Sequence, residues 1–161
     1  MYNCVNKNDD LIRCYMKTKY YLYIIALGLL FSISSCKTYY IPVESFKQQF
    51  SGWKTASLRE VTTRGPVGDI SKYNTYPIDS VKCVDKSGNP VVLTNSPALE
   101  IRFTDTDNKK TIFYFDRILV NDTTVSGVQS RILSSITKTI HLNTIKLIEI
   151  QNSGKRYKYV N

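Results

Sequence analysis

The sequence predicts a mainly β fold, in which an antiparallel meander curls into a small barrel or a two-layer sandwich after one short N-terminal amphipathic helix. Short runs of alternating apolar and polar residues fill the chain after residue 77. Turns rich in Gly, Asn, Asp and Lys separate these runs. No helical period lies between consecutive runs, so about seven or eight strands in series favour antiparallel pairing over parallel pairing with crossover helices.

One helix is expected before the strands, because four large apolar residues recur there at three- and four-residue spacing. These residues are Val43, Phe46, Phe50 and Trp53. The spacing predicts an amphipathic helix over roughly 43–51, packed across the open end of the barrel; a partner-binding aromatic stripe is the alternative. Residues 62–77 hold two glycines and two prolines without a clear period, so we expect a loop or a weak first strand.

The strands follow from alternation and from the turns between them. Residues 78–84 alternate, 85–90 (DKSGNP) is a turn, and 91–94 returns as the second strand of a hairpin. Further strands are expected at 99–103, 111–120, 125–128, 134–140 leading into 141–150, and 156–160. The order of elements over 98–151, with its TTVSG return, resembles the small SH3/Sm-like barrels.

Asp116 and Arg117 interrupt 111–120, which is the longest and most apolar of the expected strands. Neighbours in a strand point to opposite faces, so at least one of the two side chains should face the core or a groove. A barrel-rim position or a bend in the strand is the simpler interpretation. A binding role for this pair is the alternative.

The N-terminal part has the features of a secretory signal. Fourteen residues without a charge, 20–33, are too few to span a bilayer, which takes about 20 helical residues. The segment MKTK at 16–19 supplies a positive n-region before them. Residues 1–15 contain two acids, which do not suit an n-region, so we expect translation to begin at Met16, or the first fifteen residues to be a disordered leader.

The apolar run ends in Ile33, Ser34, Ser35 and Cys36. This sequence resembles the lipobox of bacterial lipoproteins, with the three residues before the cysteine as the signal-peptidase flank. The resemblance implies cleavage before Cys36 and a diacylglyceryl group and an N-acyl chain on that residue. Two or three acyl chains anchor a protein stably, whereas one does so only marginally. A transmembrane anchor and an ordinary cleaved signal with an incidental cysteine are the alternatives.

The chain therefore divides into residues 1–15, a lipoprotein signal peptide at 16–35, a tether at 36–42 and one β-rich domain at 43–161. Three stretches also resemble small lipoproteins of Bacteroidetes-type bacteria. They are ESFKQQF at 44–50, RGP at 64–66 and KTIFYFDRILVND at 110–122. This resemblance implies a lipid-anchored protein of the cell envelope and implies no activity.

Charge limits the expected partners. The first 35 residues hold four of the 22 Lys and Arg and two of the 13 Asp and Glu, so the remainder has a net charge of +7. In the envelope such a charge suits anionic lipids, lipopolysaccharide or an acidic protein partner, and we expect no nucleic acid. The positive residues are dispersed, which favours a solvated basic surface. Lys37 is not the aspartate associated with inner-membrane retention, so the outer membrane is favoured over the inner one.

Several motifs suggest chemistry, but the surrounding residues argue against each. Asp105–Asn108 begins like a calcium loop, yet lysines occupy the fifth and sixth positions. Cys83 and His141 lack the signature of a thiol nucleophile, and we expect a buried cysteine and an outward histidine. The glycines of 64–68 (RGPVG) indicate a turn and not a phosphate loop.

Metal and cofactor sites are not expected. The four cysteines lack CxxC spacing and the chain has one histidine, so the only group expected on the protein is the lipid at Cys36. Ser80 and Thr123 each follow an aspartate and resemble the O-glycosylation triplets of Bacteroidetes-type exported proteins, a pattern short enough to arise by chance.

The expected function is a lipid-anchored, non-catalytic binding or structural module of the cell envelope. An immunity or inhibitor lipoprotein that neutralises a toxin or a hydrolase is the alternative. A small envelope enzyme is a third hypothesis, disfavoured because the sequence shows no clustered catalytic set.

Overall fold

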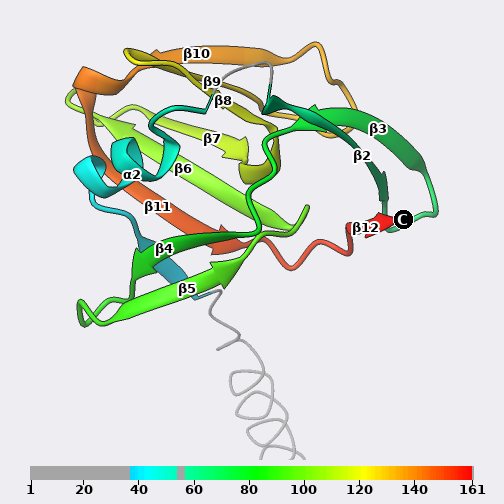
Figure 1. Ribbon diagram of the computed structural model, residues 1–161, viewed down its shortest axis with the longest axis horizontal. Coiled ribbons are helices and arrows are strands. Elements are labelled where there is room, and N and C mark those ends of the chain that lie inside the picture. Colours follow the sequence, from blue (N-terminus) through cyan, green and yellow to red (C-terminus); the bar gives the residue numbers. More distant parts are fainter. Residues whose placement is uncertain (1–36, 54–56, 161) are drawn as a thin grey trace, which may run out of the picture. The chain divides into compact units, whose positions relative to one another are not determined.

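The computed structural model describes residues 37–53 and 57–160, which belong to one compact unit, Cys36–Asn161. These residues form antiparallel sheets with one α-helix, which confirms the mainly β fold (Figure 1). The sheets pack as a sandwich and do not close into a barrel. Of the two architectures that the sequence left open, the sandwich is therefore the one adopted.

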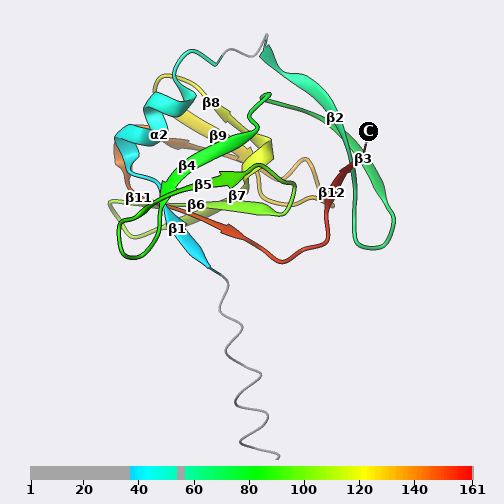
Figure 2. The same ribbon diagram turned by 60° about the horizontal axis from the view of Figure 1, so that its bottom comes forward.

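Three sheets make up the fold. Strands β5-β4-β1-β11-β6-β7 form a six-stranded sheet, and two three-stranded sheets have the orders β10-β9-β8 and β12-β2-β3. Figures 1 and 2 show β12, β2 and β3 together at one side of the domain. The strands are β1 Thr38–Tyr40, β2 Arg59–Arg64, β3 Ile70–Thr75, β4 Ser80–Val84, β5 Pro90–Thr94, β6 Leu99–Asp105, β7 Lys110–Tyr114, β8 Ile118–Val120, β9 Thr124–Val128, β10 Thr137–His141, β11 Ile145–Asn152 and β12 Lys158–Val160.

The segment expected as a tether contains a strand. Strand β1 lies inside the six-stranded sheet, with Thr38 opposite Gln151 on β11 and Tyr40 opposite Val84 on β4. The residues of β1 are β-branched or aromatic, which suits a strand. The free chain between Cys36 and the sheet is therefore much shorter than the expected 36–42.

Helix α2, Val43–Phe50, agrees with the helix expected at 43–51. Its apolar face packs onto the six-stranded sheet. The ring centroid of Phe46 lies 4.5 Å from that of Phe50 on the same helix and 5.5 Å from that of Phe103 on β6. The helix ends where Gly52 takes a positive φ of 83°, a conformation that side chains other than glycine rarely adopt. Packing within the domain, not a partner, thus accounts for the buried part of the aromatic stripe.

The core lies between the six-stranded sheet and a second layer made of α2 and the β10-β9-β8 sheet. Ile101 and Phe103 on β6 stand opposite Ile150 and Ile148 on β11, and all four side chains are at most 1% exposed. The two layers approach each other closely at Gly127 on β9, where an added Cβ would lie 2.6 Å from Cγ of Phe113. This close approach requires glycine at that position.

Two expected strands are broken by short 3-10 helices. The strand expected at 111–120 is divided by helix η2, Phe115–Arg117, so that β7 and β8 belong to different sheets. Helix η3, Leu142–Thr144, likewise separates β10 from β11 within the stretch expected at 134–150. Both helices allow the chain to pass from one layer of the sandwich to the other.

The loop or weak strand expected over 62–77 is a regular hairpin, β2–β3. Its turn is the RGPVG segment, in which the Gly65 amide donates to the Asp69 carbonyl at 2.8 Å. The turn expected there is confirmed. The sequence indicated at most one weak strand there because the inward residues carry hydroxyl groups, as at Thr63 and Thr75, instead of aliphatic side chains.

Candidate binding groove and buried ion-pair cluster

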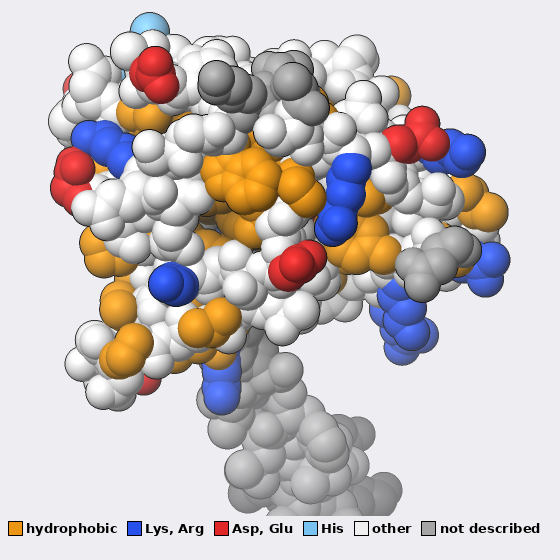
Figure 3. All heavy atoms as spheres, viewed as in Figure 1, with side chains coloured by type: hydrophobic (Ala, Val, Ile, Leu, Met, Phe, Trp, Pro, Cys, Tyr) orange, Lys and Arg blue, Asp and Glu red, His pale blue; other side chains and the backbone are white. Residues whose placement is uncertain are grey.

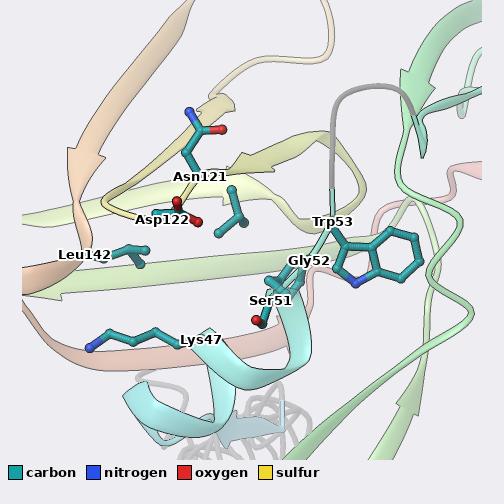
Figure 4. A pocket seen from close by; sticks show the side chains of 9 residues that line it. Lys47, Ser51, Gly52, Trp53, Asn121, Asp122 and Leu142 are labelled. Carbon is teal, nitrogen blue, oxygen red and sulfur yellow. The ribbon is translucent and has the colours of Figure 1, made fainter.

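The larger of two neighbouring hollows, of about 610 Å³, lies between the C-terminal end of α2 and the turn from β8 to β9 (Figure 4). Its floor is apolar and consists of Phe50, Val120 and Leu142, all of which are buried. Asn121 and Asp122 form the wall across from α2. The volume is within the range of small-molecule sites in proteins.

A second hollow, of about 360 Å³, adjoins the first. Phe50 and Trp53 line both hollows, and the far wall of the second comes from residues 77–82. Figure 3 shows hydrophobic side chains at the surface beside α2, on the same face of the molecule. We call the two hollows together the Trp53 groove.

Trp53 is held in place by its indole nitrogen, which donates to the Gln49 carbonyl at 3.0 Å. The ring centroids of Trp53 and Tyr76 are 5.6 Å apart, and the Trp53 side chain is partly exposed. A tryptophan fixed in this way offers a rigid aromatic surface at small cost in conformational entropy.

Gln49 also joins α2 to β4. Its side-chain amide donates to the Lys82 carbonyl at 3.0 Å and accepts from the Lys82 amide at 2.7 Å. The amide group thereby takes the place of a neighbouring strand at a part of β4 that β1 is too short to cover. These two bonds fix the distance between the walls of the groove.

The polar walls of the groove balance in charge. Lys47 and Asp122 line the larger hollow, and Asp79 and Lys82 line the smaller one. Lys47 also pairs with Glu44 at 2.9 Å on the exposed face of α2. Among the described residues, no hydrogen bond engages the side chains of Asn121 and Asp122.

Asp116 is the centre of a second, enclosed cluster. Its Oδ1 accepts a hydrogen bond from Nη2 of Arg131 at 2.6 Å, and the two side chains are 0% and 3% exposed. Its Oδ2 accepts from the hydroxyl of Tyr73 and from that of Tyr159, the latter at 3.4 Å. The carboxylate on η2 is thus bound to both β3 and β12 of the third sheet.

Aromatic rings and a carbonyl surround the Arg131 guanidinium. Its Cζ lies 4.2 Å from the ring centre of Tyr114 and 4.9 Å from that of Tyr157, and Nη2 donates to the Pro97 carbonyl. A cation over aromatic faces is stabilised by their quadrupoles, and more so when solvent is excluded. We refer to Asp116, Arg131 and these tyrosines as the Asp116 cluster. It joins the third sheet to η2 and to Tyr114 on β7 of the six-stranded sheet.

The cluster shifts the pKa of its members. Burial, the Asp116 charge and the hydrogen bond to Asp116 raise the pKa of Tyr73 to about 12, and burial and the same charge raise the pKa of Tyr159. Burial alone would lower the pKa of Arg131, but Asp116 and the bond to Tyr73 outweigh it and raise the pKa. Each neutral tyrosine and the charged arginine are therefore favoured by folding.

Alkaline pH is expected to destabilise the protein through Tyr73. The pKa of Tyr73 is about 12 in the folded state and 10.0 ordinarily, so its contribution to stability is complete below pH 10 and is lost as pH rises through 12. Thermal unfolding measured from pH 8 to pH 12 should show this fall, with a smaller slope for Tyr73→Phe because phenylalanine does not ionise. Equal slopes for the two proteins would contradict the assignment.

Asp116 and Arg117, the pair identified from the sequence, have different surroundings in the structure. Asp116 is buried within its cluster, while the half-buried Arg117 places its Cζ 3.9 Å from the ring centre of Tyr73. The bend expected at this pair is confirmed as η2, and neither residue lines the Trp53 groove. The residue expected to carry the lipid, Cys36, and the expected peptidase flank, residues 33–35, lie outside the described residues.

The other residues considered for chemistry, Cys83, His141 and Asp105, lie in three different strands. Cys83 is buried, its thiol donates to the Val91 carbonyl at 3.4 Å, and burial raises its pKa. His141 is exposed and lies in a different sheet, so the structure does not bring the two together. Asp105 uses Oδ1 to accept from the amides of Asp107 and Lys109, which is the hairpin-turn role expected for it.

Within residues 37–53 and 57–160, no helix is long and apolar enough to cross a membrane. The same residues contain no group of three or more His, Cys, Asp or Glu side chains placed to hold a metal ion.

Sequence reasoning missed the groove, although it named the aromatic residues on one side. Asn121 and Asp122 lie in the short polar segment between two expected strands, 111–120 and 125–128. Their position opposite Trp53 depends on how β8 and β9 return over the sheet. Comparisons with protein-family models, curated proteins and solved structures found no match to the chain, so the proposals below depend on its own residues.

Proposed function

We propose that the chain is a lipid-anchored protein of the cell envelope, favouring the outer membrane, and that its β domain is a non-catalytic binding module. The lipid at Cys36 attaches it to the membrane, and the Trp53 groove is its binding site. The single described histidine and the single described cysteine, His141 and Cys83, both lie outside this groove.

The start of the domain is the observation that carries the proposal. The lipobox resemblance makes Cys36 the first residue of the mature protein. Strand β1 begins at Thr38, only two residues later. An extended chain covers at most about 3.6 Å per residue, so the sheet would begin within about 7 Å of the anchored residue.

Such a short connection would hold one end of the domain at the bilayer surface. Antiparallel pairing places the turn from β4 to β5, with Lys86, and the segment after β11, with Lys155 and Arg156, at the end where β1 begins (Figures 1 and 2). These side chains suit anionic headgroups. Lys155 also pairs with Glu100 at 2.6 Å.

The Trp53 groove would then open away from the membrane. Its floor residue Leu142 precedes β11, which begins at Ile145 and reaches Gln151, the residue opposite Thr38. Six residues of strand cover about 20 Å, so the groove lies far from the anchored end. A ligand in the space beyond the bilayer would reach it without contacting the lipid surface.

Lipidation provides the direct test. We expect Cys36→Ser to abolish incorporation of a clickable fatty acid in a bacterial expression host and to leave the signal uncleaved, because the serine hydroxyl does not replace the thiol that is acylated. Gel mobility and in-gel fluorescence measure both effects in the same samples.

The matched control is Cys83→Ala, which removes the buried cysteine of the β domain. This variant should retain the label and the processing of the wild-type protein. The proposal of a lipid anchor is wrong if the wild-type protein carries no label, or if Cys36→Ser is labelled as strongly as Cys83→Ala.

A further inference from the structure

We propose that the Trp53 groove binds a neutral oligosaccharide. This inference rests on the proposed role of the groove as the binding site of the domain, and it adds the chemical class of the ligand. Four properties of the groove support it: its aromatic surface, its polar walls, its balanced charge and its length.

The aromatic surface suits the apolar face of a sugar ring. Phe50 and Trp53 line both hollows, and Trp53 is fixed by its bond to Gln49 and by contact with Tyr76. The face of an indole ring is electron-rich, whereas the C–H groups on one side of a pyranose ring carry partial positive charge. Stacking of the two surfaces removes apolar area from water on both partners.

The walls supply hydrogen-bonding groups at the edges of this surface. Ser51 and Asn121 line the larger hollow beside Asp122, and all three are exposed. Hydroxyl and carboxamide groups both donate and accept, and a carboxylate accepts two or more bonds. This combination matches the hydroxyl groups around a sugar ring, which also donate and accept.

Charge argues for a neutral ligand. Each hollow is lined by one lysine and one aspartate, so neither sign dominates although the protein as a whole is strongly basic. A site for a polyanion gathers positive side chains, as complementarity of potential requires. Among the described residues, the Trp53 groove has no such excess.

The shape favours a chain of sugar rings over a peptide strand. Hollows of about 610 and 360 Å³ lie in succession along Phe50 and Trp53, which gives room for more than one ring. A peptide would most readily add as a strand to the open part of β4. The Gln49 side chain already occupies the amide and carbonyl of Lys82 there.

The test uses Trp53 as its own reporter, because it is the only tryptophan in the chain. The full chain in a zwitterionic detergent without a sugar headgroup is titrated with chitohexaose and, separately, with maltoheptaose. We expect at least one of them to change Trp53 emission saturably and to release heat in calorimetry with the same Kd.

Two double variants test whether the oligosaccharide binds in the groove or elsewhere on the surface. Asn121→Ala with Asp122→Ala should weaken binding by about tenfold or more, since each lost hydrogen bond is worth roughly a threefold to tenfold change in Kd. The matched control, Asn74→Ala with Asp107→Ala, removes one exposed Asn and one exposed Asp that line neither hollow and should leave Kd unchanged.

Each outcome decides the question. The inference is overturned if neither sugar gives a calorimetric signal at millimolar concentration, or if the two double variants weaken binding equally. It is also overturned if a tripeptide such as tri-alanine competes for the groove as well as the sugars do. None of these results bears on the lipid anchor, which the fatty-acid label tests separately.

Discussion

Replacing Arg131 by methionine is expected to lower the free energy of unfolding by about 3–5 kcal/mol, the cost of leaving one member of a buried ion pair alone. Methionine keeps an unbranched apolar chain but supplies no donor to Asp116, whose side chain is 0% exposed. The carboxylate would retain only the hydroxyls of Tyr73 and Tyr159. Urea denaturation followed by circular dichroism measures the loss.

The control is Lys72→Met on β3, which removes an exposed ion pair. Lys72 lies 3.7 Å from Glu60, and both side chains are more than 60% exposed. Exposed pairs contribute at most about 1 kcal/mol, so this variant should unfold close to the wild type. The importance of the Asp116 cluster is refuted if Arg131→Met and Lys72→Met are equally stable.

A double variant distinguishes the cost of one unpaired buried charge from the net contribution of the ion pair. Asp116→Leu combined with Arg131→Met should recover most of the lost stability, because an apolar pair avoids the desolvation of both charges. The hairpin β2–β3 should nevertheless exchange its amide hydrogens faster than in the wild type. The reason is that the bonds from Tyr73 and Tyr159 to Asp116 attach the third sheet to the rest of the domain.

The sequence predicted those elements whose inward side chains are aliphatic or aromatic. Ile101 and Phe103 on β6 and Ile148 and Ile150 on β11 alternate with polar residues, and the same four are buried in register. Apolar periodicity reports burial against an apolar core, so it identifies strands of this kind directly. The helix α2 was found for the same reason, at its own period.

The β2–β3 hairpin of the third sheet could not be predicted in this way because it packs against charge. The remaining strand of that sheet, β12, lies within the strand expected at 156–160. The inward Tyr73 on β3 donates its hydroxyl to Asp116, and the buried Thr63 on β2 donates its hydroxyl to the Ser71 carbonyl of β3. The partners of Tyr73 are 43 and 58 residues away along the chain, at Asp116 and Arg131. A single sequence carries no local signal for such an arrangement.

Part of each candidate site was visible in the sequence. Asp116 could be identified because it interrupts an apolar stretch. Its buried ion pair with Arg131 accounts for the charge at that position. Arg131 carries no such signal, because no apolar period includes it. For the Trp53 groove the aromatic residues were visible and the opposite wall was not, because the return of β9 over the sheet depends on the break at η2.

The second large effect is expected for Phe46→Ala, which should cost about 3–5 kcal/mol of unfolding free energy. Phe46 is 0% exposed, and its ring is stacked on Phe50 and meets Phe103 edge to face. Alanine would leave a cavity under α2, and the helix has only eight residues with which to hold its position. Chemical denaturation measures the loss.

The same variant tests whether helix packing positions the groove. Phe50 and Trp53 follow Phe46 on and beyond α2, so a looser helix should shift Trp53 emission to longer wavelength and weaken oligosaccharide binding together. Gln48→Ala is the matched control, since it changes an exposed side chain of the same helix and should alter neither property. A cost below about 1 kcal/mol for Phe46→Ala would show that α2 is not fixed by its apolar face. A full cost with unchanged Trp53 emission and unchanged affinity would instead show that the Gln49–Lys82 bonds alone keep the groove in shape.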